Sequence, residues 1–303
     1  MRFLRTTTVC LALAAPALSQ AAVDSIDLSR YRETGTYALP AGVAAEASAV
    51  AYNRDRNSLF VVGDEGNFLV EVSLTGTLLG AMSLSGFDDT EGLTYIGNGK
   101  FIITEERIQD GYVLSYTPGG SATRSALPWV SIGPTLLPNG NIGIEGISYD
   151  PTTGNFVLVK EKDPQAVYEA QLTFATGATG GTANVTSLFT PALGVTDLSD
   201  VQVLSGVVTP GSPDAQNLLI YSQESRKLLE VTRSGDVLSM FTLGAGNAEG
   251  VTIDDNGTIY IVDESPFLHV LTPEPVPLPA AAWLLLSGLG GLGALRMRGR
   301  NAA

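Results

Sequence analysis

One short phrase recurs five times along the chain and constrains the fold more than any other feature. Each copy opens with Glu or Ser, continues with a small or acidic residue, and then places apolar side chains on alternate positions. The copies span 48–52 (SAVAY), 91–95 (EGLTY), 145–149 (EGISY), 199–203 (SDVQV) and 249–253 (EGVTI). Their first residues are 43, 54, 54 and 50 positions apart. A period of this length is typical of the four-stranded blades of a β-propeller, so we predict an all-β propeller of five blades.

The segments after each copy support this architecture. Asn-Gly turns, the strongest short signal for a β-hairpin, follow two of the phrases, at 97–99 and 255–257. Further runs of alternating or continuous apolar residues supply third and fourth strands, at 68–74, 78–84, 228–232 and 237–243. Before the C-terminal tail, the sequence shows no convincing helical period. A two-sheet sandwich is the alternative, but the regular repeat disfavours it.

The last repeat lacks one strand. It provides strands at 250–254, 258–263 and 267–272, whereas the N-terminal stretch 31–39 reads as a strand without a repeat of its own. Pairing this stretch with the last repeat would complete its fourth strand and remove the exposed edges of an open ring. We therefore expect the N-terminal strand to close the ring. Six blades stay open as an alternative, because the loop at 205–216 is long.

The two ends of the chain have the patterns of transport signals. Residues 1–21 combine Arg2 and Arg5, an apolar stretch and a small-residue site, which predicts a secretory signal peptide cleaved after Ala21. At the other end, a proline-rich spacer precedes the uncharged segment 280–295, which predicts a short membrane-spanning helix with arginines on the cytoplasmic side. The mature domain would then be residues 22–272.

The C-terminal pattern resembles a known sorting signal. Residues 273–303 contain PEPVPLPA, an apolar run and an arginine cluster, an order similar to that of PEP-CTERM signals in their VPLPA form. The resemblance rests on Pro273, Glu274, Pro275, Val276, Pro277, Leu278, Pro279, Ala280, Arg296, Arg298 and Arg300. It implies a Gram-negative protein of the periplasm, cell envelope or cell surface, held transiently in the inner membrane and processed by an exosortase.

The charge balance excludes several classes of protein. The chain carries 17 basic and 31 acidic residues, and five of the basic residues but only one acid lie in the two ends, so residues 22–272 have a net charge of −18. This charge excludes a nucleic-acid partner, which needs clustered Lys and Arg. The lone His269 argues against a His-rich metal centre or a Ser–His pair, and the lone Cys10 lies within the predicted signal peptide.

The repeat predicts where many of these acids meet. In a blade, the first strand starts and the second strand ends at the same edge, next to the central channel. The opening residues are Ser48, Glu91, Glu145, Ser199 and Glu249, and the candidate closing residues are Asp64, Glu65, Glu105, Glu106, Glu161, Glu224, Asp263 and Glu264. Acids facing one channel need raised pKa values, nearby cations such as Arg107 and Lys162, or a bound cation.

Oxygen ligands without His or Cys favour a hard divalent cation, so we expect a Ca²⁺ site or a site for a cationic or metal-bridged small ligand. The candidate ligands are Glu65, Asp89, Glu91, Glu106, Glu145, Glu161, Glu224, Glu249 and Glu264. Two other interpretations stay open. The acids could be purely structural in a protein-interaction platform, or they could support metal-dependent hydrolysis of a phosphoester.

Four segments carry a resemblance to the SdiA-regulated, YjiK-like family of envelope propellers. They are 86–107 (GFDDTEGLTYIGNGKFIITEER), 140–164, 197–203 together with 221–243, and 248–264 (AEGVTIDDNGTIYIVDE). The resemblance implies a periplasmic or surface-associated propeller without an established enzymatic activity. The positions that match its blade motifs are Glu91, Glu106, Glu145, Glu161, Ser199, Glu224, Glu249 and Glu264. Ala49 and Asp200 stand where the family tends to have Gly, so the openings of those blades are expected to differ in shape. A weaker similarity, limited to the Glu-Gly opening, is to phytase-like propellers, which implies a calcium-dependent phosphoesterase.

Overall fold

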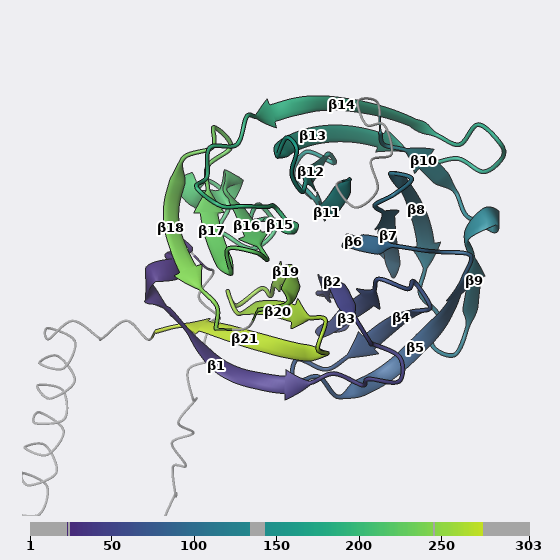
Figure 1. Cartoon of the computed structure of the whole chain (residues 1–303), viewed down its shortest axis with the longest axis horizontal. Coiled ribbons are helices and arrows are strands. Elements are labelled where there is room, and N and C mark those ends of the chain that lie inside the picture. Colours follow the sequence, from purple (N-terminus) through teal and green to yellow (C-terminus); the bar gives the residue numbers. More distant parts are fainter. Residues whose placement is uncertain (1–22, 24, 134–142, 245, 275–303) are drawn as a thin grey trace, which may run out of the picture.

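Five antiparallel sheets surround a common axis, as the blades of a propeller (Figure 1). The computed structural model describes residues 23, 25–133, 143–244 and 246–274. In these ranges the elements other than strands are three 3₁₀ turns, η1 (Leu28–Arg30), η2 (Arg124–Ala126) and η3 (Pro213–Gln216). The predicted all-β class and the count of five blades are confirmed, and the long loop after residue 204 contains η3 instead of a sixth blade.

Each blade runs outward from the axis in the order of its strands. Blade 1 consists of β2 (Ala47–Asn53), β3 (Ser58–Gly63), β4 (Phe68–Val72), β5 (Leu78–Ser85) and the parallel β9 (Ser121–Thr123). Blade 2 consists of β6 (Thr90–Gly97), β7 (Lys100–Glu105), β8 (Asp110–Ser115) and β10 (Trp129–Ser131). Blade 3 consists of β11 (Ile144–Tyr149), β12 (Phe156–Lys160), β13 (Ala166–Thr173) and β14 (Thr182–Phe189).

The last two blades complete the ring. Blade 4 consists of β15 (Asp200–Val203), β16 (Leu218–Ser222), β17 (Lys227–Val231) and β18 (Val237–Thr242). Blade 5 consists of β19 (Ala248–Ile253), β20 (Ile259–Asp263), β21 (Phe267–Pro273) and β1 (Tyr31–Ala38). The expected ring closure is therefore confirmed: β1 pairs antiparallel with β21, from Tyr31 opposite Pro273 to Ala38 opposite Phe267.

The hydrophobic core lies between neighbouring blades. The inner strands are buried on both faces; in β12 and β20, for example, every residue is buried, whereas β14 at the outer edge alternates between exposed and half-buried positions. Phe60 of blade 1 and Phe101 of blade 2 stack across one interface with ring centroids 4.4 Å apart. Each such buried ring contributes about 1.5–3 kcal/mol of transfer free energy.

The second residue of the repeated phrase sets how closely the inner strands approach. A Cβ atom on Gly250 would lie 2.8 Å from the backbone of Ala49 in blade 1, so the position tolerates no side chain. Blade 4 has Asp200 at this position, and its carboxylate instead accepts the Val251 N–H of blade 5 at 2.7 Å. The irregular blade openings expected at Ala49 and Asp200 thus correspond to two different contacts with blade 5.

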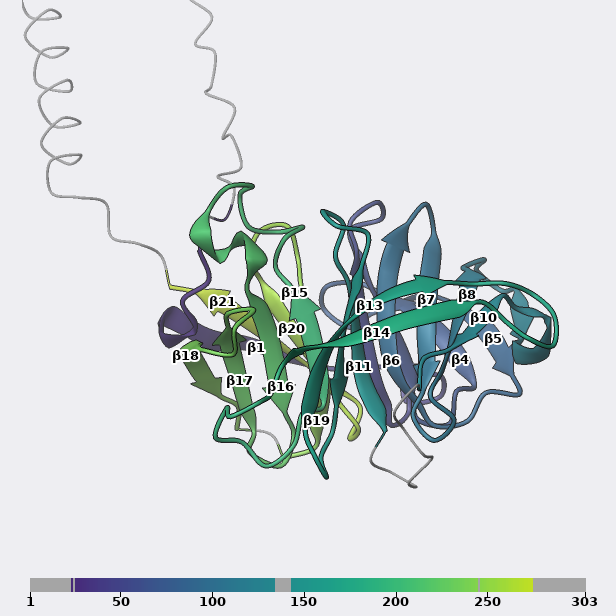
Figure 2. The same cartoon turned by 90° about the horizontal axis from the view of Figure 1, so that it is seen from above.

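The two ends of the described chain lie on the same side of the propeller, opposite the edge where the second strands end (Figure 2). The backbone N–H of Glu274 donates to the carbonyl of Arg30 at 2.8 Å, next to the start of β1. In the described ranges, no helix is both long and apolar enough to cross a membrane. The predicted signal peptide (1–21) and spanning segment (280–295) lie outside those ranges.

Candidate functional site

An acidic cavity of about 240 Å³ lies at one end of the propeller axis. It is lined by Asp64, Asp89, Glu91, Glu106, Glu145, Glu161, Lys162, Asp197, Ser199, Gln223, Glu249 and Glu264. These residues come from all five blades. The structure thus brings together seven of the nine acids proposed from the sequence as ligands.

A single position in each blade supplies the closing side chain. The residue directly after the second strand is Asp64, Glu106, Glu161, Gln223 or Glu264 in blades 1 to 5 respectively, and all five line the cavity. The opening residues Glu91, Glu145, Ser199 and Glu249 line it from the first strands. The antiparallel pairing of the first and second strands places both positions at the same edge of every blade.

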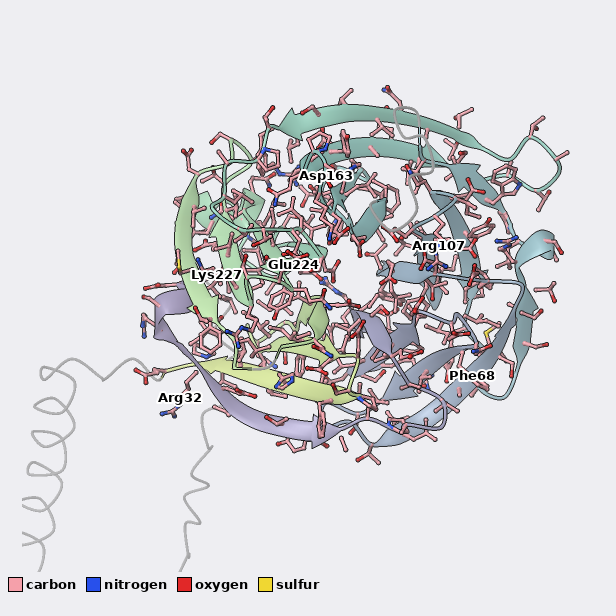
Figure 3. All side chains as sticks on the ribbon, viewed as in Figure 1. Arg32, Phe68, Arg107, Asp163, Glu224 and Lys227 are labelled. Carbon is pink, nitrogen blue, oxygen red and sulfur yellow. The ribbon has the colours of Figure 1, made fainter. Side chains whose placement is uncertain are left out.

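Glu65 and Glu224 lie outside the cavity. Both side chains are exposed, because each residue stands one position beyond the closing residue of its blade. Glu65 borders a separate hollow beside Gly63 and Phe68, and Glu224 pairs with Lys162 at 3.1 Å. Figure 3 shows Glu224 near the inner ends of the blades and Phe68 further out.

Five residues that line the cavity were not among the ligands predicted from the sequence: Asp64, Gln223, Asp197, Lys162 and Ser199. The first two could have been found by aligning the ends of the second strands instead of choosing the nearest Glu. Asp197 is buried and lies just before the opening residue of blade 4. Its carboxylate accepts hydrogen bonds from the Ser222 hydroxyl and from the Glu224 N–H, so these contacts help to hold the loop of blade 4.

Burial and mutual repulsion keep protons on several of these acids. Burial first, and then the charges of Asp64, Asp89 and Glu106, raise the pKa of Glu91 to about 8. Burial also raises the pKa of Glu106 to about 7 and that of Glu145 well above its ordinary value. In the absence of a cation, the cavity is therefore partly protonated near neutral pH.

Some buried oxygens in the cavity have no donor to bind. Asp89 and Glu106 are 1% and 0% exposed. With the carboxyls ionised, Asp89 Oδ2, Glu106 Oε2 and Oε2 of the more accessible Glu161 accept no hydrogen bond from the described residues. When a neighbouring carboxyl is protonated, Glu106 shares a hydrogen bond with Asp89 or Glu145. An unsatisfied buried carboxylate oxygen is costly, and only a proton or a cation can satisfy several that face each other. The donor set fits a hard divalent cation.

Two basic side chains offset part of the charge. Arg107 places Nη2 2.9 Å from Oδ1 of Asp89, and Lys162 places Nζ 2.5 Å from Oε1 of Glu161. The nearby Lys160 is directed elsewhere, because its Nζ donates to the carbonyls of Lys162 and Pro164. The acids in the cavity therefore still outnumber the basic groups that contact them.

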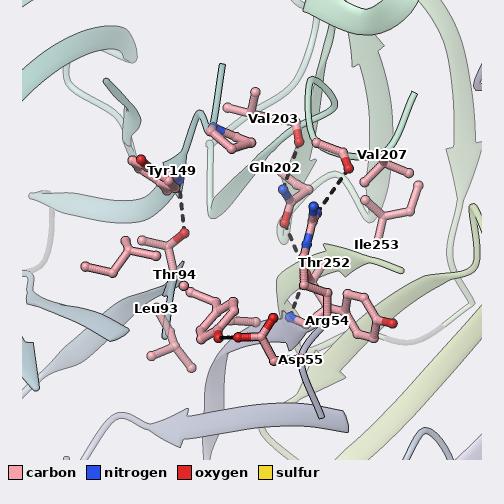
Figure 4. A pocket seen from close by; sticks show the side chains of 17 residues that line it. Arg54, Asp55, Leu93, Thr94, Tyr149, Gln202, Val203, Val207, Thr252 and Ile253 are labelled. Carbon is pink, nitrogen blue, oxygen red and sulfur yellow. Dashed lines mark hydrogen bonds between the residues drawn. The ribbon is translucent and has the colours of Figure 1, made fainter. Parts of the chain in front are cut away.

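The opposite end of the axis holds a second, less polar cavity of about 160 Å³ (Figure 4). Hydroxyls in the fourth position of the phrase connect neighbouring blades here: Thr94 accepts the Tyr149 N–H at 3.0 Å, and Thr252 donates to Gln202 at 3.0 Å. The polar groups of this cavity thus bind one another, in contrast to those of the acidic cavity.

His269 does not line the acidic cavity. It belongs to β21, and its Nδ1 is 2.8 Å from Oε1 of Glu33 in β1, so it joins the two strands that close the ring. Among the described residues, no Ser–His or Cys–His pair lines the acidic cavity. The chemistry that the cavity offers is thus coordination by oxygen and exchange of protons.

The model of the SdiA-regulated family matches residues 23–271, which is most of the chain. The chain belongs to the SdiA-regulated family. Among solved structures, it is similar to a glutaminyl cyclase from Myxococcus xanthus, at 13% identity, a TM-score of 0.52, and coverage of 82% of this chain and 97% of that chain.

Two further solved structures resemble this member of the SdiA-regulated family. The propeller domain of Doa1 has 9% identity and a TM-score of 0.46 over 80% of this chain and 97% of that chain. A luciferin-regenerating enzyme has 11% identity and a TM-score of 0.44 over 80% of this chain and 94% of that chain. At these identities, the likeness to the cyclase shows the fold and nothing about activity.

Proposed function

We propose that this member of the SdiA-regulated family is an exported, non-enzymatic binding protein of the cell envelope whose acidic cavity holds Ca²⁺. The observation that carries the proposal is the set of buried carboxylate oxygens without donors, in Asp89 and Glu106 above all. Ca²⁺ takes six to eight oxygen ligands in flexible geometry, and the cavity supplies many carboxylates from several blades. A bound cation would replace the protons that the ion-free protein keeps there.

Export is the second part of the proposal. It rests on the signal-like residues 1–21 and the sorting pattern at 273–303, including PEPVPLPA and the arginines that follow the apolar run. In the proposed order of events, the signal is removed after Ala21 and an exosortase processes the C-terminal segment. Millimolar calcium outside the cytoplasm would suit a moderate affinity, as in other extracellular calcium sites.

Titration calorimetry tests the cation site. We expect CaCl₂ added to EDTA-treated, dialysed protein in 150 mM KCl to give saturable heat and to raise the Tm, and the same additions to Glu106→Gln to give a weaker response. Glu65→Gln is the matched control, because it removes an exposed acid outside the cavity. If CaCl₂ gives neither heat nor a Tm shift in the wild-type protein, the proposal is contradicted.

A further inference from the structure

The closing residue of each blade faces the opening residue of the next. The backbone shows this contact between blades 1 and 2, where the Thr90 N–H donates to the carbonyl of Asp64, and between blades 3 and 4, where the Leu198 N–H donates to that of Glu161. The successive pairs around the ring, each at a junction of two blades, are Asp64 and Glu91, Glu106 and Glu145, Glu161 and Ser199, Gln223 and Glu249, and, by position, Glu264 and Ser48. Both members of the first four pairs line the cavity, whereas of the fifth pair only Glu264 does.

Only two of these junctions have an acid on both sides. At the other three, one member of the pair is Ser or Gln. Between blades 4 and 5 the neutral partner satisfies the acid directly, since Nε2 of Gln223 donates to Oε1 of Glu249 at 2.6 Å. Closing and opening acids of neighbouring blades therefore pair only between blades 1 and 2 and between blades 2 and 3, whereas the acids Glu249 and Glu264 of blade 5 share a hydrogen bond with each other.

At both acidic junctions a third acid joins the pair. Asp89 lies with Asp64 and Glu91, and in each such group one carboxylate oxygen of every residue lies within 4.8 Å of one from each of the others. The second group consists of Glu106, Glu145 and Glu161. Two oxygens bound to one Ca²⁺ at about 2.4 Å are at most about 4.8 Å apart, so each group can close on a single ion.

Each group also contains a nearly inaccessible oxygen without a donor. In the first group it is Oδ2 of Asp89, and in the second it is Oε2 of Glu106. One basic side chain, Arg107 or Lys162, contacts each group. With all three carboxylates ionised, one divalent ion would bring each group and its basic neighbour to neutrality.

We propose that the cavity binds two divalent cations at separate positions, one held by Asp64, Asp89 and Glu91 and the other by Glu106, Glu145 and Glu161. The inference rests on the proposed function and adds the number and location of the ions. Blade 2 supplies ligands to both positions through Asp89, Glu91 and Glu106, and the neighbouring carboxyls of Asp89 and Glu106 mark where the two positions adjoin.

Stoichiometry tests the inference. Native mass spectrometry and calorimetry with CaCl₂ should find two ions per wild-type chain, one in Asp64→Asn, one in Glu161→Gln and none in the double variant. These two residues are half-buried and therefore better suited to substitution than the fully buried Asp89 and Glu106. Glu249→Gln, at a junction with one acid, should keep two ions, and the exposed Glu65→Gln and Glu224→Gln are controls matched to the two ligand variants.

The outcomes separate the two proposals. No ion in the wild type contradicts the proposed function itself. A wild type that binds one ion, lost in both Asp64→Asn and Glu161→Gln, overturns the two-position inference. The loss of an ion in Glu249→Gln overturns it too. Either result still agrees with the proposed function of binding a cation. If a variant fails to fold, as judged by its circular dichroism melt, wild-type crystals soaked in MnCl₂ decide the question: two anomalous peaks support the inference, and one overturns it.

Discussion

Nε2 of Gln223 lies 2.6 Å from Oε1 of Glu249 and joins blade 4 to blade 5 by a hydrogen bond. At the corresponding junctions of blades 1 and 2 and of blades 2 and 3, an acid occupies the place of this amide. Neighbouring blades are therefore held together at these junctions in one of two ways. Between blades 4 and 5 an amide donates directly to a carboxylate, whereas two facing acids need a shared proton or a bound cation. The difference between them can be measured one residue at a time.

Gln223→Glu should make the junction of blades 4 and 5 depend on a bound cation. The change removes the amide donor and adds another carboxyl beside Glu249, which already neighbours Glu264. We therefore expect the ion-free protein to lose about 1–3 kcal/mol of stability at pH 8. Added CaCl₂ should raise the Tm of the variant by more than it raises the Tm of the wild type. Urea unfolding in EDTA and in CaCl₂ measures both effects, and an unchanged stability in EDTA would contradict the prediction.

The stability of the ion-free protein should fall as the pH rises above neutrality. Burial first, and then Glu91 and Glu264, raise the pKa of Glu249 from its ordinary 4.5 to about 10. Because the folded-state pKa is the higher one, the stabilisation is complete below about pH 4.5 and is lost as the pH approaches 10. Glu249→Gln should therefore flatten the dependence of stability on pH between 6 and 9, as followed by urea unfolding in EDTA.

Arg124→Ala should be strongly destabilising although Arg124 lies in the short turn η2, between β9 of blade 1 and β10 of blade 2. Nη1 of Arg124 contacts both carboxylate oxygens of Glu105, at 3.0 and 2.9 Å, and Glu105 is fully buried. Removal of the guanidinium leaves a buried carboxylate without its cation, which costs about 3 kcal/mol. Arg32→Ala, at an exposed position of β1 (Figure 3), should change the Tm little by comparison.

Gly250→Ala should destabilise the ring where blade 5 meets blade 1. The new methyl group would lie 2.8 Å from both the Cα of Ala49 and the carbonyl of Ser48, and backbone atoms cannot rotate away. We expect a loss of about 1–3 kcal/mol. Gly42→Ala is the control, because its Cβ would have no atom within 4 Å. Equal melting temperatures for the two variants would show that the contact does not limit packing.

The mature protein should begin at Ala22. If residues 1–21 act as a signal, protein recovered from the periplasm of an expressing Gram-negative host has this N-terminus by intact-mass measurement. Substitution of Arg2 and Arg5 by Glu should shift the protein to the cytoplasm with the segment retained, because the signal needs a basic start. Wild-type protein found only in the cytoplasm at full mass would contradict the prediction.

The fold could be predicted because the repeated phrase marks the first strand of every blade. The site could be predicted only as far as the ends of the second strands could be placed. Asp64 and Glu65 are adjacent, and which of them faces the axis depends on where β3 ends, after Gly63, before a turn with Gly66 at φ +59°. Periodicity does not determine that boundary. The donorless oxygen of Glu106 depends on side-chain packing, which no sequence pattern specifies.

The pairing of β1 with β21 also sets the order of events when the protein is made. The first strand of the domain is synthesised more than 200 residues before its partner, since Tyr31 pairs with Pro273. Until the last strand emerges from the ribosome, β1 has no sheet to join, and β20 remains an open edge. Any product truncated before residue 267 keeps that edge unpaired, so the ring can close only after the chain has been made through β21.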